Sequence, residues 1–595
     1  MLKKLVLLTL LLAFSQGIHA QGTIPDGNYR LALIGSPSAE TTQALLKVET
    51  KDGTQTASVL AVPPRSTVKL TSYKANGQEI VLTLSNGMTF TSHSAGSEKS
   101  ILGSMATDTI AYRAKLAPTD QTEFAQPSDA IVRVKSPEAY GKAVSLNNRP
   151  MTLRIQAQNE KDAEKRKKIQ DQLPAAQKEA DEKVADLYRE VIEKHSDQLA
   201  ALDSASALLG MAQKAKVSRA EAEKLIGIIE KHAKPYGLPY TNYVLSRTGT
   251  TLLREKGLEA LALKVIQSAY QSMPASWSAS RQHPVVTAYL QALVANKNTS
   301  EAKVIEAKLA KMDADMDKEY LATVPPFKPV AFAGRKNTSA NQVAVLELFT
   351  GAQCPPCVAA DVAFDALEKA YDHKDLVLIQ YHMHIPGPDP MTNPDTVARF
   401  NYYRKLFPND MRGTPSTLFN GKPGAGSGGG MDRAQAKFEQ YKEIIDPILE
   451  KSSQVKVNGT ASRDGDKIDI HLDVYGVEVA DQLKLKTIIV EETVKYVGSN
   501  RLRFHHQVVR AMPGGIEGVS IKDKNFKHQV SADISKLRSE LNNYLDEFGK
   551  TRPFPSTNRP LDMKNLKVIA LVQNQETGEI VQACQIDVTG KVAAK

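Results

Sequence analysis

Two cysteines with two residues between them, Cys354 and Cys357, are the residues of this chain best suited to chemistry. They follow an apolar run, Val343–Phe349, that predicts a buried strand, and they precede a helical pattern from about Val358 to Tyr371. A helix N-terminus carries partial positive charge and free backbone N–H groups, and both favour a thiolate over a thiol. The sequence therefore predicts a redox-active dithiol, with Cys354 as the exposed, attacking sulfur and Cys357 as the buried, resolving one.

The start of the chain predicts export. Lys3 and Lys4 precede the apolar run Leu5–Phe14, and Ala20 supplies a small residue at the expected cleavage site, so residues 1–20 are interpreted as a signal peptide. A periplasmic or extracellular protein lies where disulfides persist. The only other cysteine, Cys584, lies in a strand-like run and is expected to be a buried free thiol. A C-x-x-C pair in such a protein favours redox chemistry over a structural framework.

The composition indicates a multidomain globular protein. The chain has 595 residues, too many for one domain, and 42% of them are hydrophobic and 24% charged. The formal net charge of +10 is spread along the chain and includes no arginine-rich tract with interleaved aromatic residues. We therefore expect no nucleic-acid partner.

Pattern changes divide the chain into five regions after the signal peptide. The run Ile80–Leu84 with the turn Ser85-Asn86-Gly87 indicates β structure, apolar residues three and four apart in Ala222–Ile229 indicate helices, and Lys467–Val474 alternates strictly. We expect an N-terminal β domain at 21–118, a linker at 119–153, a region of α-helical hairpins at 154–323, an α/β domain at 324–451 and a β-sandwich-like domain at 452–595.

The α/β region carries a second motif. After the helix that follows the cysteines come an apolar strand, Leu376–His382, a proline-rich loop and a helix at Asp395–Leu406. The dipeptide Thr414-Pro415 then precedes a strand at Thr417–Asn420, and a last helix spans about Asp432–Lys451.

This order of elements, with Cys354-Pro355-Pro356-Cys357 and Thr414-Pro415, resembles the thioredoxin-like superfamily. The segment Glu347-Leu348-Phe349-Thr350, the cysteines and Asp361 resemble a secreted thioredoxin-like family of unknown function with an E-L-F-T…C-x-x-C…A-D signature. The domain order resembles multidomain periplasmic thiol reductases. The resemblance implies that Pro415 is a cis-proline facing the disulfide and that Thr414 offers backbone groups to the substrate.

Two acids are candidate proton acceptors for Cys357, namely Glu347 and Asp361. Thioredoxins carry their buried acid six residues before the first cysteine, whereas Glu347 lies seven before Cys354 and would point to the other face of the strand. The alternative for each acid is an ordinary ion-paired or capping role. Gln353 stands where thioredoxins usually have a tryptophan.

His382 and His384 alternate at a strand end and are weak candidates for a Cu(I) site with the cysteines. Three functions follow in order of support. The first is an exported thiol–disulfide oxidoreductase that acts on protein thiols or disulfides, with no cofactor beyond the Cys354–Cys357 disulfide. If the protein is a reductase, a membrane partner would have to supply its reductant, because the sequence shows no transmembrane electron conduit. The alternatives are a scaffold or binding protein with a structural or vestigial disulfide, and a copper-handling protein.

Overall fold

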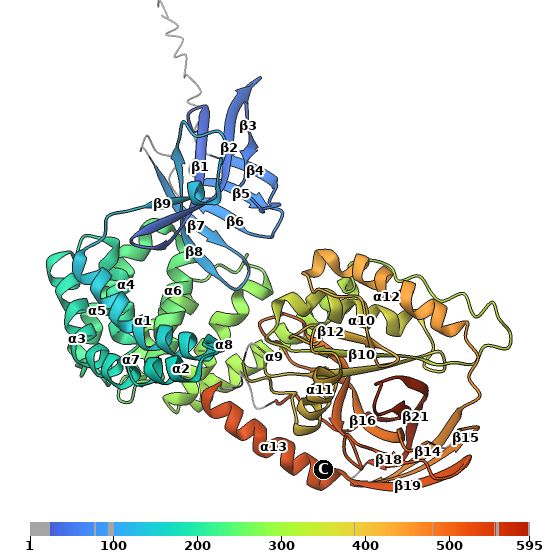
Figure 1. Ribbon diagram of the computed structural model, residues 1–595. Helices are drawn as coiled ribbons and strands as arrows, with labels where there is room; N and C mark the ends of the chain where they lie inside the picture. Colours follow the sequence, from blue (N-terminus) through green and yellow to red (C-terminus); the bar gives the residue numbers. More distant parts are fainter. Residues whose placement is uncertain are drawn as a thin grey trace, which may run out of the picture. The chain divides into compact units, whose positions relative to one another are not determined.

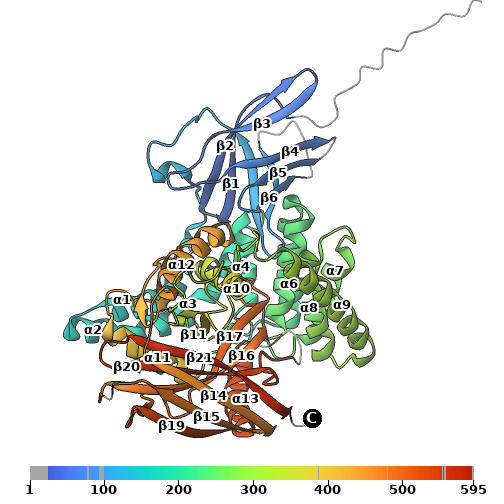
Figure 2. The ribbon, with the colours of Figure 1, turned by 90° about the vertical axis from the view of Figure 1, so that its right-hand side faces the viewer.

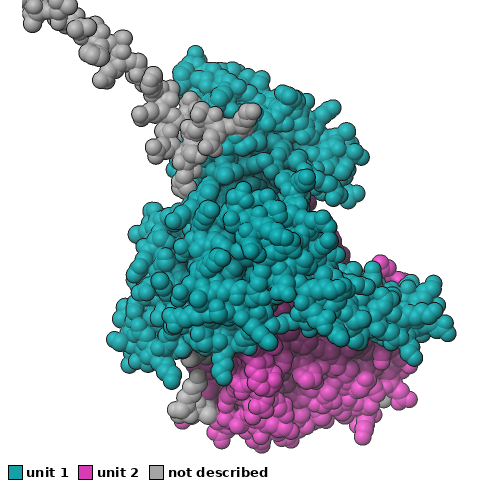
Figure 3. Space-filling model, turned by 90° about the vertical axis from the view of Figure 1, so that its left-hand side faces the viewer, with its two compact units in different colours: residues 1–316 teal, residues 317–595 magenta. Residues whose placement is uncertain are grey.

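The computed structural model describes residues 24–76, 79–92, 100–385, 387–478, 480–552, 554 and 558–592. The predicted signal peptide, 1–20, lies outside these residues. The chain divides into two compact units, Met1–Met316 and Asp317–Lys595, shown in two colours in Figure 3. The predicted boundary at residue 324 lies seven residues beyond the start of the second unit.

The N-terminal part of unit 1 is the expected β domain, an antiparallel sheet with the order β3-β2-β1-β8-β7-β6-β5-β4. Alternating side chains of these strands bury one face around Leu31, Leu82 and Phe90. The strands are β1 (Gly27–Ser36), β2 (Ala39–Lys51), β3 (Thr54–Ala61), β4 (Leu70–Asn76), β5 (Glu79–Leu84), β6 (Thr89–Ser92), β7 (Ile101–Ala106) and β8 (Ala111–Pro118).

The rest of unit 1 is helical, as expected, and successive helices contact each other as hairpins. Small and branched side chains three and four apart, such as Leu225, Ile226 and Ile229, form its core. The helices are α1 (Glu138–Asn159), α2 (Ala163–Gln170), α3 (Leu173–Lys194), α4 (Leu199–Leu209), α5 (Arg219–Ala233), η2 (Lys234–Tyr236), α6 (Leu238–Leu252), α7 (Glu259–Ser272), α8 (Ala279–Ala295) and α9 (Thr299–Thr323).

The segment 119–153, expected to be a linker, is largely structured. It contains η1 (Pro127–Ala130), β9 (Ile131–Arg133), which pairs with β2, and the first four turns of α1. The prediction was wrong because α1 has a weak amphipathic pattern and Pro150 lies inside the helix, where the sequence suggested a break. The helix packs through Tyr140, Ala143 and Leu153 instead.

The cysteines belong to an α/β layer of unit 2. Its elements are β10 (Ala344–Thr350), η3 (Pro355–Cys357), α10 (Val358–Ala370), β11 (Leu376–His382), α11 (Pro394–Leu406), β12 (Ser416–Phe419), β13 (Lys422–Pro423), η4 (Met431–Arg433) and α12 (Ala434–Leu449). β10 runs parallel to β11 and antiparallel to β12. α10 and α12 cover one face of these strands, and α11 covers the other (Figure 1). Every residue of β10 and β11 is buried, which is typical of parallel strands covered on both faces.

The C-terminal region is rich in strands, as expected, but it continues the sheet of the α/β layer. Its elements are β14 (Lys456–Gly465), β15 (Lys467–Tyr475), β16 (Leu483–Lys495), β17 (Phe504–Ala511), β18 (Val519–Ser520), β19 (Asn525–Asp533), α13 (Ile534–Thr551), β20 (Leu566–Asn574) and β21 (Ile580–Val592). The strand order is β13-β12-β10-β11-β17-β16-β20-β21-β14-β15-β19. The expected separate sandwich at 452–595 is therefore wrong in its boundary, because β17 pairs in parallel with β11.

β21 joins two layers. Its first half pairs with β20 and its second half pairs with β14. β14 and β15 fold over β16 and β20, with Ile470, Ile489 and Val568 in the shared core (Figure 2). A second core, between β10, β11, α11, β16 and β20, lies behind the cysteine-bearing strand.

Candidate functional site

The two cysteines lie where β10 gives way to α10. Cys354 and Cys357 form a disulfide, and the backbone N–H of Cys357 donates a hydrogen bond to the carbonyl oxygen of Cys354 at 3.0 Å. The intervening prolines form the turn η3, and α10 begins at Val358. The apolar β-forming sequence of β10 and the proline-initiated turn place the pair at the helix start, as the sequence predicts.

The Thr414–Pro415 peptide bond is cis, as predicted, and it lies against the first cysteine. The Thr414 hydroxyl donates a hydrogen bond to Cys354 Sγ at 3.4 Å, and the Thr414 carbonyl oxygen lies 3.9 Å from the same sulfur. The structure thus brings together the two motifs that the sequence separates by about 60 residues.

Cys354 is less accessible than expected. Its exposed fraction is 3%, and that of Cys357 is 0%. A glycine-rich strip, 424–430, lies against the turn that holds the cysteines: the Gly429 N–H donates to the Pro356 carbonyl oxygen at 2.7 Å. A Cβ atom on Gly428 would lie 2.0 Å from that oxygen and 2.9 Å from Pro415 Cδ. The prediction of an exposed Cys354 was wrong: Thr414 contacts its sulfur, and the glycine-rich strip packs on the adjacent Pro356 and Pro415.

Asp361 lies one helical turn beyond Cys357 on α10, so the two side chains share a face of the helix. The Thr350 hydroxyl donates to its Oδ2 at 2.9 Å, and Gln380 Nε2 donates to its Oδ1 at 3.2 Å. Burial raises the pKa of Asp361 well above its usual range, while the Thr350 hydrogen bond acts in the opposite direction and Asp365 adds repulsion. Asp361 therefore binds a proton more readily than an exposed carboxylate.

Glu347 faces the opposite core. Its fully buried carboxylate pairs with Arg399, with 2.8 Å between Nη2 and Oε1, and accepts hydrogen bonds from the Tyr381 and Tyr403 hydroxyls. Arg399 also donates to Gln573 at 2.7 Å. The carboxylate of Glu347 and the guanidinium of Arg399 are paired with each other. Of the two roles that the sequence allows for Glu347, this pairing fits the ion-paired structural acid and not the proton acceptor for Cys357.

His382 and His384 occupy different surroundings. His382 is fully buried, with Nδ1 3.3 Å from Asp389 Oδ2 and Nε2 3.1 Å from Gln380 Oε1. His384 is exposed, and its Nδ1 accepts a hydrogen bond from the Asp389 N–H at 3.3 Å. Within the described ranges, no three His, Cys, Asp or Glu side chains are grouped to hold a metal ion.

Sequence reasoning missed two polar residues beside this site, Gln380 and Asp389. Gln380 is the one amide in β11 and follows four apolar residues, and that interruption of a buried strand was a usable signal. Asp389 lies in the proline-rich loop, where an acid is typical of a turn. Asp389 is fully buried and accepts a hydrogen bond from the Ala352 N–H at 2.6 Å, directly before the cysteines.

Cys584 is outside the site. It lies on β21, it is half-buried, and burial raises the pKa of its thiol to about 12. Its thiol is therefore little ionised at neutral pH; the cysteine is free, as expected, but half-buried and not fully buried.

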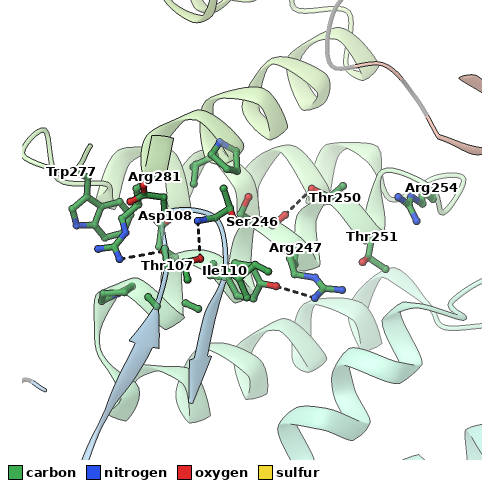
Figure 4. A pocket seen from close by; sticks show the side chains of 18 residues that line it. Thr107, Asp108, Ile110, Ser246, Arg247, Thr250, Thr251, Arg254, Trp277 and Arg281 are labelled. Carbon is green, nitrogen blue, oxygen red and sulfur yellow. Dashed lines mark hydrogen bonds between the residues drawn. The ribbon is translucent and has the colours of Figure 1, made fainter. Parts of the chain in front are cut away.

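Unit 1 contains a separate cavity of about 330 Å³ between the β7–β8 turn and helices α6 and α8. Figure 4 shows Trp277 and Arg281 beside the turn at Thr107 and Asp108, with Arg247 and Arg254 on the α6 side. The Arg281 guanidinium lies 5.3 Å from the centre of the Trp277 ring and donates to the Thr107 carbonyl oxygen. The cavity is lined by three guanidinium groups and one carboxylate, so its electrostatic potential is positive.

No family model and no curated protein matches the chain. Among solved structures, HBP35 of Porphyromonas gingivalis is similar, with 16% identity over 44% of this chain and 81% of its own, at a TM-score of 0.31. Protein AGR_C_4864 from Agrobacterium tumefaciens is similar with 15% identity over 43% of this chain and 98% of its own, at a TM-score of 0.28. Neither likeness carries an argument about fold or activity.

None of the helices in the described part of the chain is both long enough and apolar enough to cross a membrane.

Proposed function

We propose that this protein is an exported thiol–disulfide oxidoreductase with a thioredoxin-like domain in unit 2. The observation that carries the proposal is the Cys354–Cys357 disulfide at the start of α10, in contact with the cis Thr414–Pro415 bond. A cis-proline exposes the backbone of the residue before it, and Thr414 here lies next to Cys354, whose sulfur would attack the partner. The signal-peptide pattern in 1–20 supports export.

The strand arrangement supports the thioredoxin-like assignment. β10, α10 and β11 form a parallel β-α-β unit, and β12 and β13 add as antiparallel strands on the other side of β10. The sheet order β13-β12-β10-β11 places the cis-proline strand beside the cysteine strand. This is the arrangement that the resemblance implies for a thioredoxin-like core.

In the reducing direction, the Cys354 thiolate attacks one sulfur of a partner protein's disulfide. A bond forms between Cys354 and that sulfur, and the other partner sulfur leaves as a thiolate. Cys357 then loses its proton to Asp361 and attacks Cys354 Sγ, which closes the Cys354–Cys357 disulfide and releases the second partner thiolate. The partner gains two electrons and takes two protons from water. A protein dithiol, held by a membrane partner, returns two electrons to the pair.

A trapping experiment tests the proposal. Cys357→Ser removes the resolving thiol, so we expect a mixed disulfide to accumulate on Cys354 with a protein disulfide substrate. Cys354→Ser should lower disulfide reduction by at least about 100-fold. Cys584→Ser is the matched control and should leave both results unchanged. No mixed disulfide with Cys357→Ser, together with unchanged partner binding, would favour a scaffold protein with a structural disulfide.

The cavity of unit 1 favours a second candidate function, the binding of a small anion. Three guanidinium groups and the Trp277 ring offer charge and a flat apolar face to such a ligand. Trp277 is the only tryptophan of the chain, so tryptophan emission, excited at a wavelength that tyrosine does not absorb, reports on this cavity. Titration with aromatic carboxylates should quench it, and Arg281→Ala should weaken the response about tenfold, while Arg219→Ala outside the cavity should not. An unchanged emission across aromatic carboxylates and phosphates would contradict a binding role.

A further inference from the structure

The cavity in unit 1 follows α6 over most of its length. A stripe of side chains on this helix lines it, with members four residues apart: Pro239, Tyr243, Arg247 and Thr251. Residues four apart on a helix lie on the same face, and the helix between the first and last of them spans about 18 Å at a rise of about 1.5 Å per residue. Figure 4 shows Trp277 at one end of the cavity and Arg254 at the other. A volume of about 330 Å³ spread over this length suits an extended chain better than a compact ligand.

Three guanidinium groups line this cavity without a counter-charge of their own. Within the described ranges, no salt bridge joins Arg247, Arg254 or Arg281 to a carboxylate. Arg113 of the neighbouring strand β8, in contrast, has Asp203 at 2.7 Å. The arginines of the cavity are therefore available to the carboxylates of a ligand.

Arg281 is the most enclosed of the three, because it is half-buried while the other two are exposed. Its guanidinium lies over the Trp277 ring and donates to the Thr107 carbonyl oxygen at 3.3 Å. Burial lowers the pKa of Arg281, and Asp108 acts in the opposite direction. The Asp108 carboxylate itself accepts a hydrogen bond from the Ser278 hydroxyl at 3.1 Å. An anion bound beside Arg281 would compensate this cation for the water that burial removes.

A second hollow, of about 290 Å³, lies on the adjacent stripe of α6. It shares Tyr243, Arg247 and Thr251 with the cavity, so the two adjoin along this row of side chains. Its lining also includes the aliphatic side chains of Leu202 and Leu209 from α4. A ligand held by Arg247 can therefore place an aliphatic group in this hollow, next to its anionic group.

The spacing of the arginines indicates the kind of chain that fits. Arg247 and Arg254 are seven residues apart in the sequence, about 10 Å at the helical rise, and acidic residues three apart on an extended polypeptide have the same spacing. We propose that the cavity is a docking groove for an extended acidic segment of a partner protein, with aliphatic residues between its acids. This inference rests on the anion-binding role proposed for the cavity. Carboxylates of the segment pair with the arginines, and an aliphatic side chain enters the hollow beside Leu202.

Because Trp277 and Arg254 lie at opposite ends, the length of the groove can be tested in the full-length protein. The probe is a peptide of about nine residues, acetylated and amidated, that repeats glutamate, leucine and glycine. Benzoate is the small-anion reference. Tryptophan emission and calorimetry measure both dissociation constants. We expect the peptide to bind at least about tenfold more tightly than benzoate, and the same peptide with glutamine in place of glutamate to lose at least about tenfold.

Two variants report on the two ends. Arg254→Ala should weaken the binding of the peptide about tenfold and leave that of benzoate unchanged, because only a ligand as long as the groove reaches both Trp277 and Arg254. Arg281→Ala should weaken both. Arg219→Ala, an exposed position of α5 outside the cavity, is the matched control and should change neither.

The outcomes separate this inference from the function on which it rests. If benzoate binds but the glutamate peptide binds no more tightly, or if Arg254→Ala binds the peptide normally, the groove is overturned and the binding of small anions stands. Tighter binding of a galacturonate trisaccharide than of the peptide, with the same dependence on Arg254, would assign the groove to an acidic saccharide and overturn a protein partner. If neither emission nor calorimetry detects any of these probes, both proposals fall.

Discussion

Glu347, a residue of β10, and Asp361, on α10, both have buried carboxyl groups, and the two groups lie on opposite faces of β10. Glu347 points into the core behind the strand and is held by Arg399. Asp361 comes from α10 on the other side and reaches the hydroxyl of Thr350, the last residue of β10. One acid has a permanent cationic partner, and the other has only neutral hydrogen-bond donors. This difference favours a structural role for Glu347 and, under the proposed function, proton transfer by Asp361.

Removing Arg399 tests the structural role. Arg399→Met leaves the Glu347 charge buried without a partner, so we expect a loss of about 3–5 kcal/mol in the free energy of unfolding. Urea denaturation measures it. Lys183→Met, which breaks the exposed pair with Glu179 on α3, should leave the same quantity nearly unchanged, because water screens this pair. A loss for Arg399→Met as small as this control would show that Glu347 is not held as described.

The pH dependence of stability should carry the signature of Asp365. Burial raises the pKa of its carboxyl from 3.8 to about 6, partly offset by His506. Because the folded-state value is the higher one, the stabilisation is fully present below about pH 4 and is lost as pH rises through about 6. Asp365→Asn should therefore gain stability over the wild type by about 3 kcal/mol between these limits. Urea titrations at several pH values measure this gain.

The exposed variant Asp432→Asn is the control for this titration and should run parallel to the wild type at every pH. A pH-independent difference between Asp365→Asn and the wild type would count against the raised pKa.

The glycine-rich strip should control access to Cys354. A side chain at Gly428 meets the Pro356 oxygen and Pro415, so Gly428→Ala must displace the strip. We expect reduced Gly428→Ala to be alkylated at Cys354 several-fold faster than the wild type, as measured by the rate of iodoacetamide labelling. Gly426→Ala is the matched control, because a Cβ there meets no atom within 4 Å. Equal labelling rates in the two variants would mean that the strip does not shield the sulfur.

The α/β layer should not fold when cut at the boundary that the sequence suggests. A fragment of residues 324–451 lacks β16, β17 and β20, which supply Val490, Val509 and Ile569 to the core behind β10. We expect this fragment to unfold without a cooperative transition in circular dichroism. The fragment 317–595, which is one compact unit, should unfold cooperatively. A cooperative transition in the shorter fragment would contradict the shared core.

What the sequence predicts well is local. The apolar β10 and the helix after Cys357 follow from periodicity and residue type over a few positions. The position of β17 beside β11 cannot be predicted in this way, because the pairing joins residues more than a hundred positions apart. The local sequence of each strand fits a separate sheet equally well. The hydrogen bonds that join Gln380, His382 and Asp389 also stayed hidden, since each residue has an ordinary local explanation.

The position of β17 in the sheet has a consequence for how the chain is made. Cys354 and Cys357 leave the ribosome long before β17, β20 and β21, which close the core behind their strand. During that interval the two thiols belong to an unfinished sheet with an open strand edge at β11. A nascent chain that reaches an oxidising compartment can therefore form the Cys354–Cys357 disulfide early. The completed sheet then encloses a disulfide that formed before the sheet was complete.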